Sequence, residues 1–187
     1  MYDVAIIGAG PTGASAALFA AKAGKKTLVI DANQSITKRA WIENHYGVNE
    51  ITGPDLVENG KKQAAKFGAE IVAAKAVKIA AAGEGLTIET DSESYQAAKV
   101  ILATGLATDL AEASGIATKP GTEPRVKTVV ATDAAGQTNV PGVYAAGAAA
   151  GTSLHTIITA GDGARVAVEV LSALNGERYV DHDVLKA

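Results

Sequence analysis

The stretch YDVAIIGAGPTG, Tyr2 to Gly13, decides the fold of this 187-residue chain. Its apolar, β-branched part, Asp3–Ile7, predicts a short buried strand that stops at Gly8, and the small residues that follow predict a helix ending at Gly24. The run KTLVID then predicts a second buried strand over Thr27–Ile30. Strand, helix and strand within about thirty residues form a βαβ unit. We therefore expect a parallel sheet with a right-handed crossover.

The glycines of this unit have the G-x-G-x-x-G spacing at Gly8, Gly10 and Gly13. In a loop between a strand and a helix, the first glycine permits a tight turn, the second lets a pyrophosphate approach the backbone, and the third lets the helix pack on the strand. The helix N-terminus then offers free N–H groups to the phosphates. Asp31 follows the second strand, 18 residues after Gly13. This is close to the spacing of about 20 residues at which an acid accepts a hydrogen bond from a ribose. The motif predicts a dinucleotide site, and Asp31 favours FAD or NAD over NADP unless it only caps the strand–loop junction.

Composition excludes several other classes of protein. The formal net charge is −3 with pI ≈ 5.6, and no basic stripe indicates a nucleic-acid surface. The chain has no cysteine, and His45, His155 and His182 lack metal-ligand spacing, so we expect neither a thiol redox centre nor a metal site. No apolar stretch reaches about 18 residues, and the residues before the first strand show no signal-peptide pattern, so we expect neither a membrane span nor a signal peptide. We expect a cytoplasmic protein that does not enter the membrane.

The rest of the chain completes an α/β pattern. Residues 32–53 are irregular, and a helix is expected over about 54–67. Strands of a meander are then predicted by the short runs EIVAA, AVKIAA, LTIETD, SYQAA and VILATG, between residues 70 and 105. Residues 106–124 read as a connection, two further strands follow, and a last helix is expected over about 156–174. The predicted fold class is α/β, a Rossmann-like fold of the two-dinucleotide-binding type with a central parallel sheet and a small β-meander.

Several segments also resemble a known family. YDVAIIGAGPTGASAALFAAKAG, VILATG and TNVPGVYAAG are similar to the FAD-binding domain of the thioredoxin reductase-like, pyridine nucleotide-disulfide oxidoreductase family. IENHYG followed by GPDL resembles its segment beside the flavin, and TAGDGARVAVEVL resembles its C-terminal helix. The resemblance implies that residues 1–187 form a single FAD-binding domain. It implies that FAD is held by Gly8, Gly10, Pro11, Thr12, Gly13, Asp31, Asn44, Val77, Ala103, Thr104, Gly105, Gly147, Ala148, Thr156 and Ile157.

Three departures from the family pattern bear on function. Ala148 stands where the family places an aspartate that binds the ribityl chain, and the lost charge-assisted hydrogen bond should cost about 1.5–3 kcal/mol of FAD binding. Only residues 106–124 stand where the family carries a nicotinamide-binding domain. The redox cysteine pair is missing, and His45-Tyr46 replaces the family's aromatic-proline pair. We therefore expect the flavin domain of such an enzyme without thioredoxin reductase activity.

Two functional hypotheses remain open from the sequence. The first is a minimal FAD-dependent oxidoreductase, with NAD(P)H or a redox partner protein as electron donor and no catalytic side chain assigned, because the cofactor carries the chemistry. The alternative is a non-catalytic module that binds FAD or NAD and acts as electron carrier or redox sensor with a partner chain. His45 and His155 are either proton relays or ordinary polar residues at the pocket rim. A homodimer through residues 35–50 would shield an exposed flavin.

Overall fold

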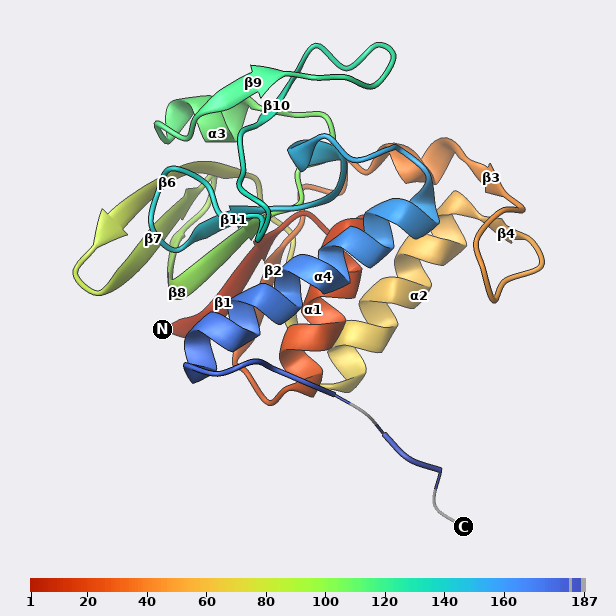
Figure 1. Ribbon diagram of the computed structural model, residues 1–187, viewed down its shortest axis with the longest axis horizontal. Helices are drawn as coiled ribbons and strands as arrows, with labels where there is room; N and C mark the ends of the chain where they lie inside the picture. The colour runs from red at the N-terminus through yellow and green to blue at the C-terminus, as the bar shows by residue number, and fades with distance from the viewer. Residues whose placement is uncertain (182, 186–187) are drawn as a thin grey trace.

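The computed structural model of the protein describes residues 1–181 and 183–185, and its centre is a seven-stranded sheet (Figure 1). The strand order is β5-β2-β1-β8-β7-β6, and β11 also pairs with β8. The strands are β1 Tyr2–Ile7, β2 Thr27–Ile30, β5 Glu70–Val72, β6 Ala76–Ala82, β7 Gly85–Thr90, β8 Ser94–Leu102 and β11 Val143–Ala145. The predicted α/β fold with a central parallel sheet is confirmed.

The register of the parallel strands brings their carboxyl ends to one edge of the sheet. Ile7 pairs with Ile30 on one side and with Leu102 on the other. Ala145 pairs with Leu102 in turn. The loops that follow β1, β2, β8 and β11 therefore meet at this edge, which is where open α/β sheets bind ligands.

Two expectations for residues 70–105 were wrong. The run that begins at Glu70 is not part of a meander, because β5 pairs in parallel with β2. The runs SYQAA and VILATG are not separate strands either, since both contribute to the single strand β8. The first half of β8 is antiparallel to β7, and its second half is parallel to β1 and β11. One strand thus joins the meander β6-β7-β8 to the parallel sheet.

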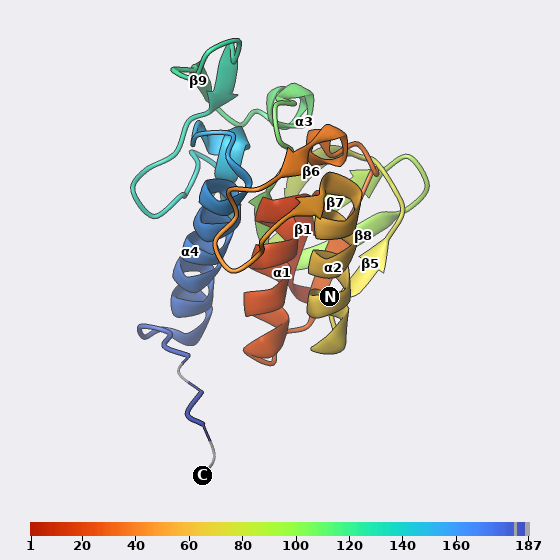
Figure 2. The same ribbon diagram turned by 90° about the vertical axis from the view of Figure 1, so that its right-hand side faces the viewer.

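Three helices cover one face of the sheet: α1 Pro11–Lys22, α2 Gly53–Lys66 and α4 Thr156–Asn175 (Figures 1 and 2). The alternation of β1 fits this arrangement, because Val4 and Ile6 pack in a core cluster with the alanines of α1 and the valines of α4. Ala5 and Ile7 join the cluster of the opposite face, which includes residues of β6, β7 and the short helix α3 Asp109–Ala113. The sheet is therefore buried on both sides, as parallel sheets are.

The helices begin and end largely as the sequence predicts. Pro54 lies in the first turn of α2, and the backbone N–H of Asp55 donates to Thr52 Oγ1 at 3.2 Å, which caps the helix. Helix α4 ends at Gly176, whose φ of 73° is the left-handed conformation expected after a helix. The bounds of α2 and α4 lie within one residue of the expected ranges, about 54–67 and 156–174.

The irregular segments are more structured than expected. Residues 32–53 contain the 3-10 helix η1 Ile36–Arg39 and a two-stranded ribbon of β3 Trp41–Ile42 and β4 Ile51–Thr52. The connection 106–124 contains α3 and β9 Thr118–Pro120, and β9 pairs with β10 Thr128–Val130 in an antiparallel hairpin. The short 3-10 helix η2 Gly147–Ala150 follows β11. The hairpin stands out from the body beyond the carboxyl edge of the sheet (Figures 1 and 2).

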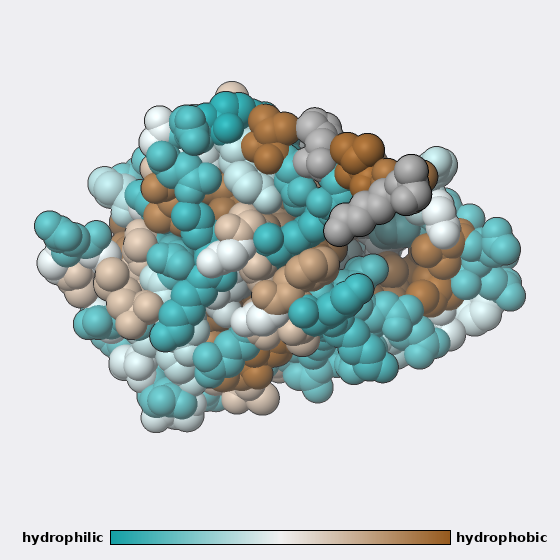
Figure 3. Space-filling model, turned by 90° about the horizontal axis from the view of Figure 1, so that it is seen from below, coloured by the Kyte–Doolittle hydropathy of each residue, from teal (hydrophilic) through white to brown (hydrophobic). Residues whose placement is uncertain are grey.

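The opposite end of the molecule has a mixed surface. In the view of Figure 3, apolar residues form separate small patches among hydrophilic ones. Over residues 1–181 and 183–185, no helix combines the length and apolar character needed to span a membrane.

Candidate functional site

A cavity of about 460 Å³ opens at the carboxyl edge of the sheet, within the size range of small-molecule pockets. The phosphate loop, residues 8–13 between β1 and α1, forms one of its walls, and the loop after β2 forms another. The segment before β6, the loop after β8, η2 and the start of α4 form the rest. Predicted cofactor-binding residues that line it are Gly8, Gly10, Pro11, Thr12, Asp31, Ala103, Thr104, Gly105 and Ala148. The fold thus brings nine positions from distant segments to one cavity.

The phosphate loop has the open backbone that a pyrophosphate requires. Gly8 has φ 105°, and a Cβ there would lie 2.5 Å from the carbonyl oxygen of Ala103, so no other residue fits this turn. Gly10 is the N-cap of α1, and no side chain caps the helix there. Because the first helical N–H groups have no partner within the helix, those of Thr12 and Gly13 are available at this end. The N-terminus of α1 therefore fits a phosphate.

Gly13 lies behind the cavity wall. A Cβ on Gly13 would lie 1.8 Å from the carbonyl oxygen of Gly8 and 3.3 Å from Cβ of Ala103. Its hydrogen lets α1 pack directly on the end of β1, which is the role that the spacing assigns to the third glycine.

Asp31 lines the cavity as expected, but it has a partner that the sequence did not indicate. Its Oδ2 lies 2.5 Å from Nζ of Lys61 in α2, and its Oδ1 accepts from the backbone N–H of Asn33 at 2.9 Å. Asp31 is buried and Lys61 is largely so. A carboxylate has about four lone-pair sites, so Asp31 can still accept from a ribose hydroxyl. Lys61 would place a compensating positive charge beside such a hydroxyl.

The glycine-alanine stretch after β11 serves both packing and the cavity. A Cβ on Gly147 would lie 2.1 Å from Oγ1 of Thr12, so η2 rests directly on the phosphate loop. The Gly147 N–H donates to Oδ2 of Asp162 in α4 at 2.7 Å, and Arg165 donates to the other oxygen of Asp162 at 2.8 Å. Ala148, the next residue, faces the cavity. Asp162 thus holds the turn that presents Ala148 and does not replace its missing carboxylate.

One wall of the cavity is formed before β6. Lys75 and Ala76 line it, whereas Val77 does not and is exposed, so an adenine contact at Val77 stays a prediction. Lys75 Nζ lies 3.7 Å from Oδ2 of Asp109, at the start of α3, and both residues line the cavity. This ion pair joins the segment before β6 to the loop after β8.

Asn44, Thr156 and Ile157 lie outside the cavity lining. Thr156 and Ile157 form the first turn of α4, one turn before Thr159, which does line it. Nδ1 of His45, next to Asn44, lies 3.0 Å from Oγ1 of Thr156 and ties the 43–50 loop to the start of α4. Burial lowers the pKa of His45, because it disfavours the charged imidazolium.

The two remaining histidines are His155 and His182. Nδ1 of His155 lies 2.9 Å from Oγ of Ser153, and His182 lies outside the described residues. Within the part of the chain that the structure describes, no three His, Cys, Asp or Glu residues are grouped to hold a metal ion.

Comparison with known proteins names the family. Residues 2–129 match the pyridine nucleotide-disulphide oxidoreductase family. The chain belongs to this family. FAD is the cofactor of these oxidoreductases. The cavity lies at the carboxyl edge of the sheet, where folds of this type bind a dinucleotide.

Relatives within the pyridine nucleotide-disulphide oxidoreductase family extend well beyond this chain. A thioredoxin reductase from Peptoclostridium acidaminophilum is 42% identical over 119 residues, which cover 62% of this chain and 38% of that protein. One from Listeria monocytogenes is 37% identical over 108 residues, covering 56% and 34%. The matched part thus spans little more than a third of the length of these curated relatives.

Solved structures show the same fold. An atypical thioredoxin reductase from Desulfovibrio vulgaris Hildenborough aligns with a TM-score of 0.84 at 20% identity, covering 95% of this chain and 99% of that chain. A thioredoxin reductase from Gloeobacter violaceus gives 0.85 at 17% identity, covering 98% and 99%.

Proposed function

We propose that this chain binds FAD in the cavity at the carboxyl edge of its sheet and works as a minimal FAD-dependent oxidoreductase. The observation that carries the proposal is the continuous wall from the open phosphate loop through Asp31 to Ala148. Residues 1–187 would form a single FAD-binding domain, with 106–124 in place of a nicotinamide-binding domain. FAD held by these residues would supply the redox chemistry, with NAD(P)H as hydride donor or a redox partner protein as electron donor, and with a separate electron acceptor.

The roles of the chain's own residues follow from where they lie. Gly8 and Gly10 leave room for the pyrophosphate, and the first N–H groups of α1 bind its oxygens. Asp31 accepts from the adenosine ribose, while Thr104 and Gly105 border the cofactor from the end of β8. The family resemblance, and not the cavity lining, assigns Asn44 and the backbone N–H groups of Thr156 and Ile157 to the flavin. Electron transfer through this site needs no disulfide, which agrees with a sequence that contains no cysteine.

A second candidate is a non-catalytic module that holds FAD or NAD for a partner chain. Ala148 favours it, because the missing carboxylate weakens the hold on a ribityl chain by about ten- to a hundredfold. The shortness of residues 106–124 favours it too, since a nicotinamide donor finds little binding surface there.

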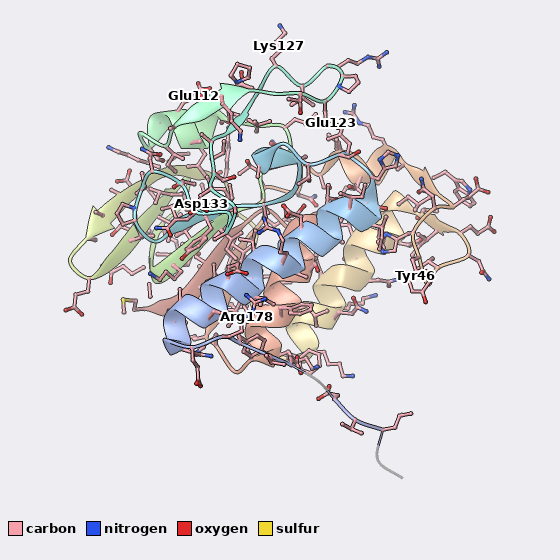
Figure 4. The ribbon with its side chains drawn as sticks, in the orientation of Figure 1. Tyr46, Glu112, Glu123, Lys127, Asp133 and Arg178 are labelled. Atoms are coloured by element: carbon pink, nitrogen blue, oxygen red, sulfur yellow. The ribbon has the colours of Figure 1, made fainter. Side chains whose placement is uncertain are left out.

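We further propose that two copies of the chain associate through residues 35–50. Trp41 is 60% and Tyr46 92% exposed, and burial against a second copy would remove their apolar surface from water. Tyr46 stands clear of the body in Figure 4. The contact between His45 and Thr156 joins this surface to the exposed Ile157, so a second copy would cover all three apolar side chains. A monomer in sedimentation velocity at micromolar concentration would exclude this dimer.

The first experiment is a visible absorption spectrum of the purified protein, with identification of any cofactor released on denaturation. About one FAD per chain is the expected result. The matched variant is Gly10→Val, because a φ of −68° at Gly10 suits any residue and the added side chain fills the cradle. The new Cβ would lie 3.0 Å from Oγ of Ser35, a side chain that can rotate away. This variant should unfold like the wild-type apoprotein yet bind no FAD.

Anaerobic mixing with NADH or NADPH separates the two candidates. Bleaching of the flavin by either nucleotide over repeated turnovers, with an acceptor dye present, supports the enzyme. A flavin that neither nucleotide reduces, yet that exchanges electrons with a protein partner, supports the carrier. A protein that stays colourless with added FAD, while NAD binds, contradicts the flavoenzyme.

A further inference from the structure

The β9–β10 hairpin carries a net positive charge. Lys119, Arg125 and Lys127 are exposed, and with Glu123 they give residues 119–127 a net charge of +2 in a chain whose formal net charge is −3. Among residues 1–181 and 183–185, none of the three cations lies within ion-pair distance of a carboxylate. Lys127 points away from the body in Figure 4, whereas Glu123 lies on the side of the body.

The hairpin is held in place rather than free to collapse onto the sheet. The N–H of Gly121 donates to the carbonyl of Lys127 at 3.0 Å, and a Cβ at Gly121 would lie 2.6 Å from the carbonyl oxygen of Val126. At its base, Val129 packs against Gly151, where a Cβ would lie 3.4 Å from its side chain. The three cations are therefore displayed on a folded element anchored next to η2.

The hairpin base and the cavity share their neighbours. Helix η2, which contributes Ala148 to the cavity, leads directly to Gly151 and the hairpin base. Leu106 and Leu154 also line the cavity, yet they are 42% and 39% exposed. Transient protein interfaces have an apolar centre and a polar rim. Leu106 and Leu154 at the mouth of the cavity would form such a centre, and the hairpin cations would form part of its rim.

We propose that this surface, namely the hairpin cations with Leu106 and Leu154, docks an acidic electron-carrier protein. The inference rests on the proposed function, since the carrier serves the flavin. Two reduced carrier molecules each give up one electron, and these two electrons with a proton from solvent reduce the flavin. Opposite charges steer such partners together and raise association rates by about 10- to 1,000-fold at low salt. The negative charge of the rest of the chain repels the carrier from other faces and so favours this orientation.

The test uses an acidic plant-type [2Fe–2S] ferredoxin as the probe. Its oxidised form is titrated into the full chain by calorimetry at low and high salt, a measurement that does not require flavin. The triple variant K119E/R125E/K127E should weaken binding at least about tenfold at low salt, and the loss should vanish at high salt, where charges are screened. The matched control reverses three exposed lysines elsewhere, K62E/K66E/K78E, and should lose much less.

Further variants keep the result interpretable. The neutral triple K119Q/R125Q/K127Q covers the case in which charge reversal disturbs the hairpin, and thermal unfolding verifies that each variant folds. Equal loss in the hairpin and control variants would overturn the docking site, as would unchanged binding in both hairpin variants. A hairpin variant that loses NADPH affinity but still binds ferredoxin would overturn it in favour of a nucleotide phosphate. Hairpin-dependent ferredoxin binding without bound FAD supports the docking surface while contradicting the flavoenzyme.

Discussion

The contact between α1 and α4 can be tested by adding a single methyl group at Gly163. A Cβ there would lie 2.1 Å from the carbonyl oxygen of Thr12 and 2.8 Å from its carbonyl carbon. Ordinary contacts begin at 3.4 Å, so in Gly163→Ala the two helices must separate by roughly 1 Å. Overpacking of this kind costs about 1–3 kcal/mol, and the obstacle here is backbone, which cannot rotate away.

Helix propensity acts in the opposite direction and sets the net effect. Alanine is better than glycine in a helix interior by about 0.8–1.0 kcal/mol. Because the obstacle is backbone, we take the upper end of the overpacking cost, about 3 kcal/mol. Subtracting the gain in helix propensity leaves a destabilisation of about 2 kcal/mol for Gly163→Ala. Gly161 lies two residues earlier in α4 with nothing within 4 Å of the added Cβ. Gly161→Ala should therefore stabilise the protein by up to about 1 kcal/mol, which makes it the matched control.

Urea unfolding of the two apoproteins measures the difference, expected to be about 3 kcal/mol between the variants. FAD titration adds a second readout, because Thr12 belongs to the phosphate loop and its displacement should weaken binding only in Gly163→Ala. Equal stability of the two variants would refute the close approach of α4 to the start of α1. Wild-type FAD affinity in a destabilised Gly163→Ala would refute the link between this contact and the cradle.

Three further predictions concern the cavity and the α4 contact. Ala148→Asp should tighten FAD about ten- to a hundredfold by fluorescence titration, and unchanged affinity would mean that Ala148 does not face the ribityl chain. Lys61→Gln should destabilise the apoprotein by about 1.5–3 kcal/mol in urea, because Asp31 loses its partner; in a double-mutant cycle with Asp31→Asn, additive effects would contradict the ion pair. Burial lowers the pKa of His45, so as pH falls below about 6.5 the unfolded chain binds the proton first and folded stability declines. Urea unfolding across this range should therefore show a steeper loss in the wild type than in His45→Gln, and parallel profiles would contradict it.

The sequence predicted those features that depend on local pattern. The βαβ unit followed from the strand run before Gly8, the small residues of α1 and the run before Asp31, because buried strands and helix ends have local signals. The helix stop at Gly176 was likewise readable from the residue type. Nine of the predicted cofactor positions meet at the cavity because the G-x-G-x-x-G spacing and the family resemblance both rest on backbone geometry.

Strand pairing and long-range contacts could not be read in the same way. An apolar run such as residues 70–74 shows that a strand exists, but its pairing with β2 depends on the path of α2 between them. The runs SYQAA and VILATG are separated only by Lys99, and β8 continues through this residue, because residue type alone sets strand ends poorly. Lys61 carries no motif, and its place beside Asp31 is fixed only when α2 packs on α1.

The bare stretch from Ala145 to Gly151 combines these two kinds of information. Its lack of side chains is visible in the sequence and suits either a close backbone contact or a ligand lying on the main chain. In the structure, neighbouring residues fill these two roles. Gly147 makes the close contact, with Thr12, and Ala148 lines the cavity where a ligand would lie. Packing and binding are therefore coupled at this turn, because whatever moves Gly147 away from Thr12 also moves the phosphate loop relative to Ala148. A cradle assembled from two such segments keeps its shape only while α1 and α4 stay in contact, which is why Gly163, outside the cavity lining, is expected to govern cofactor affinity.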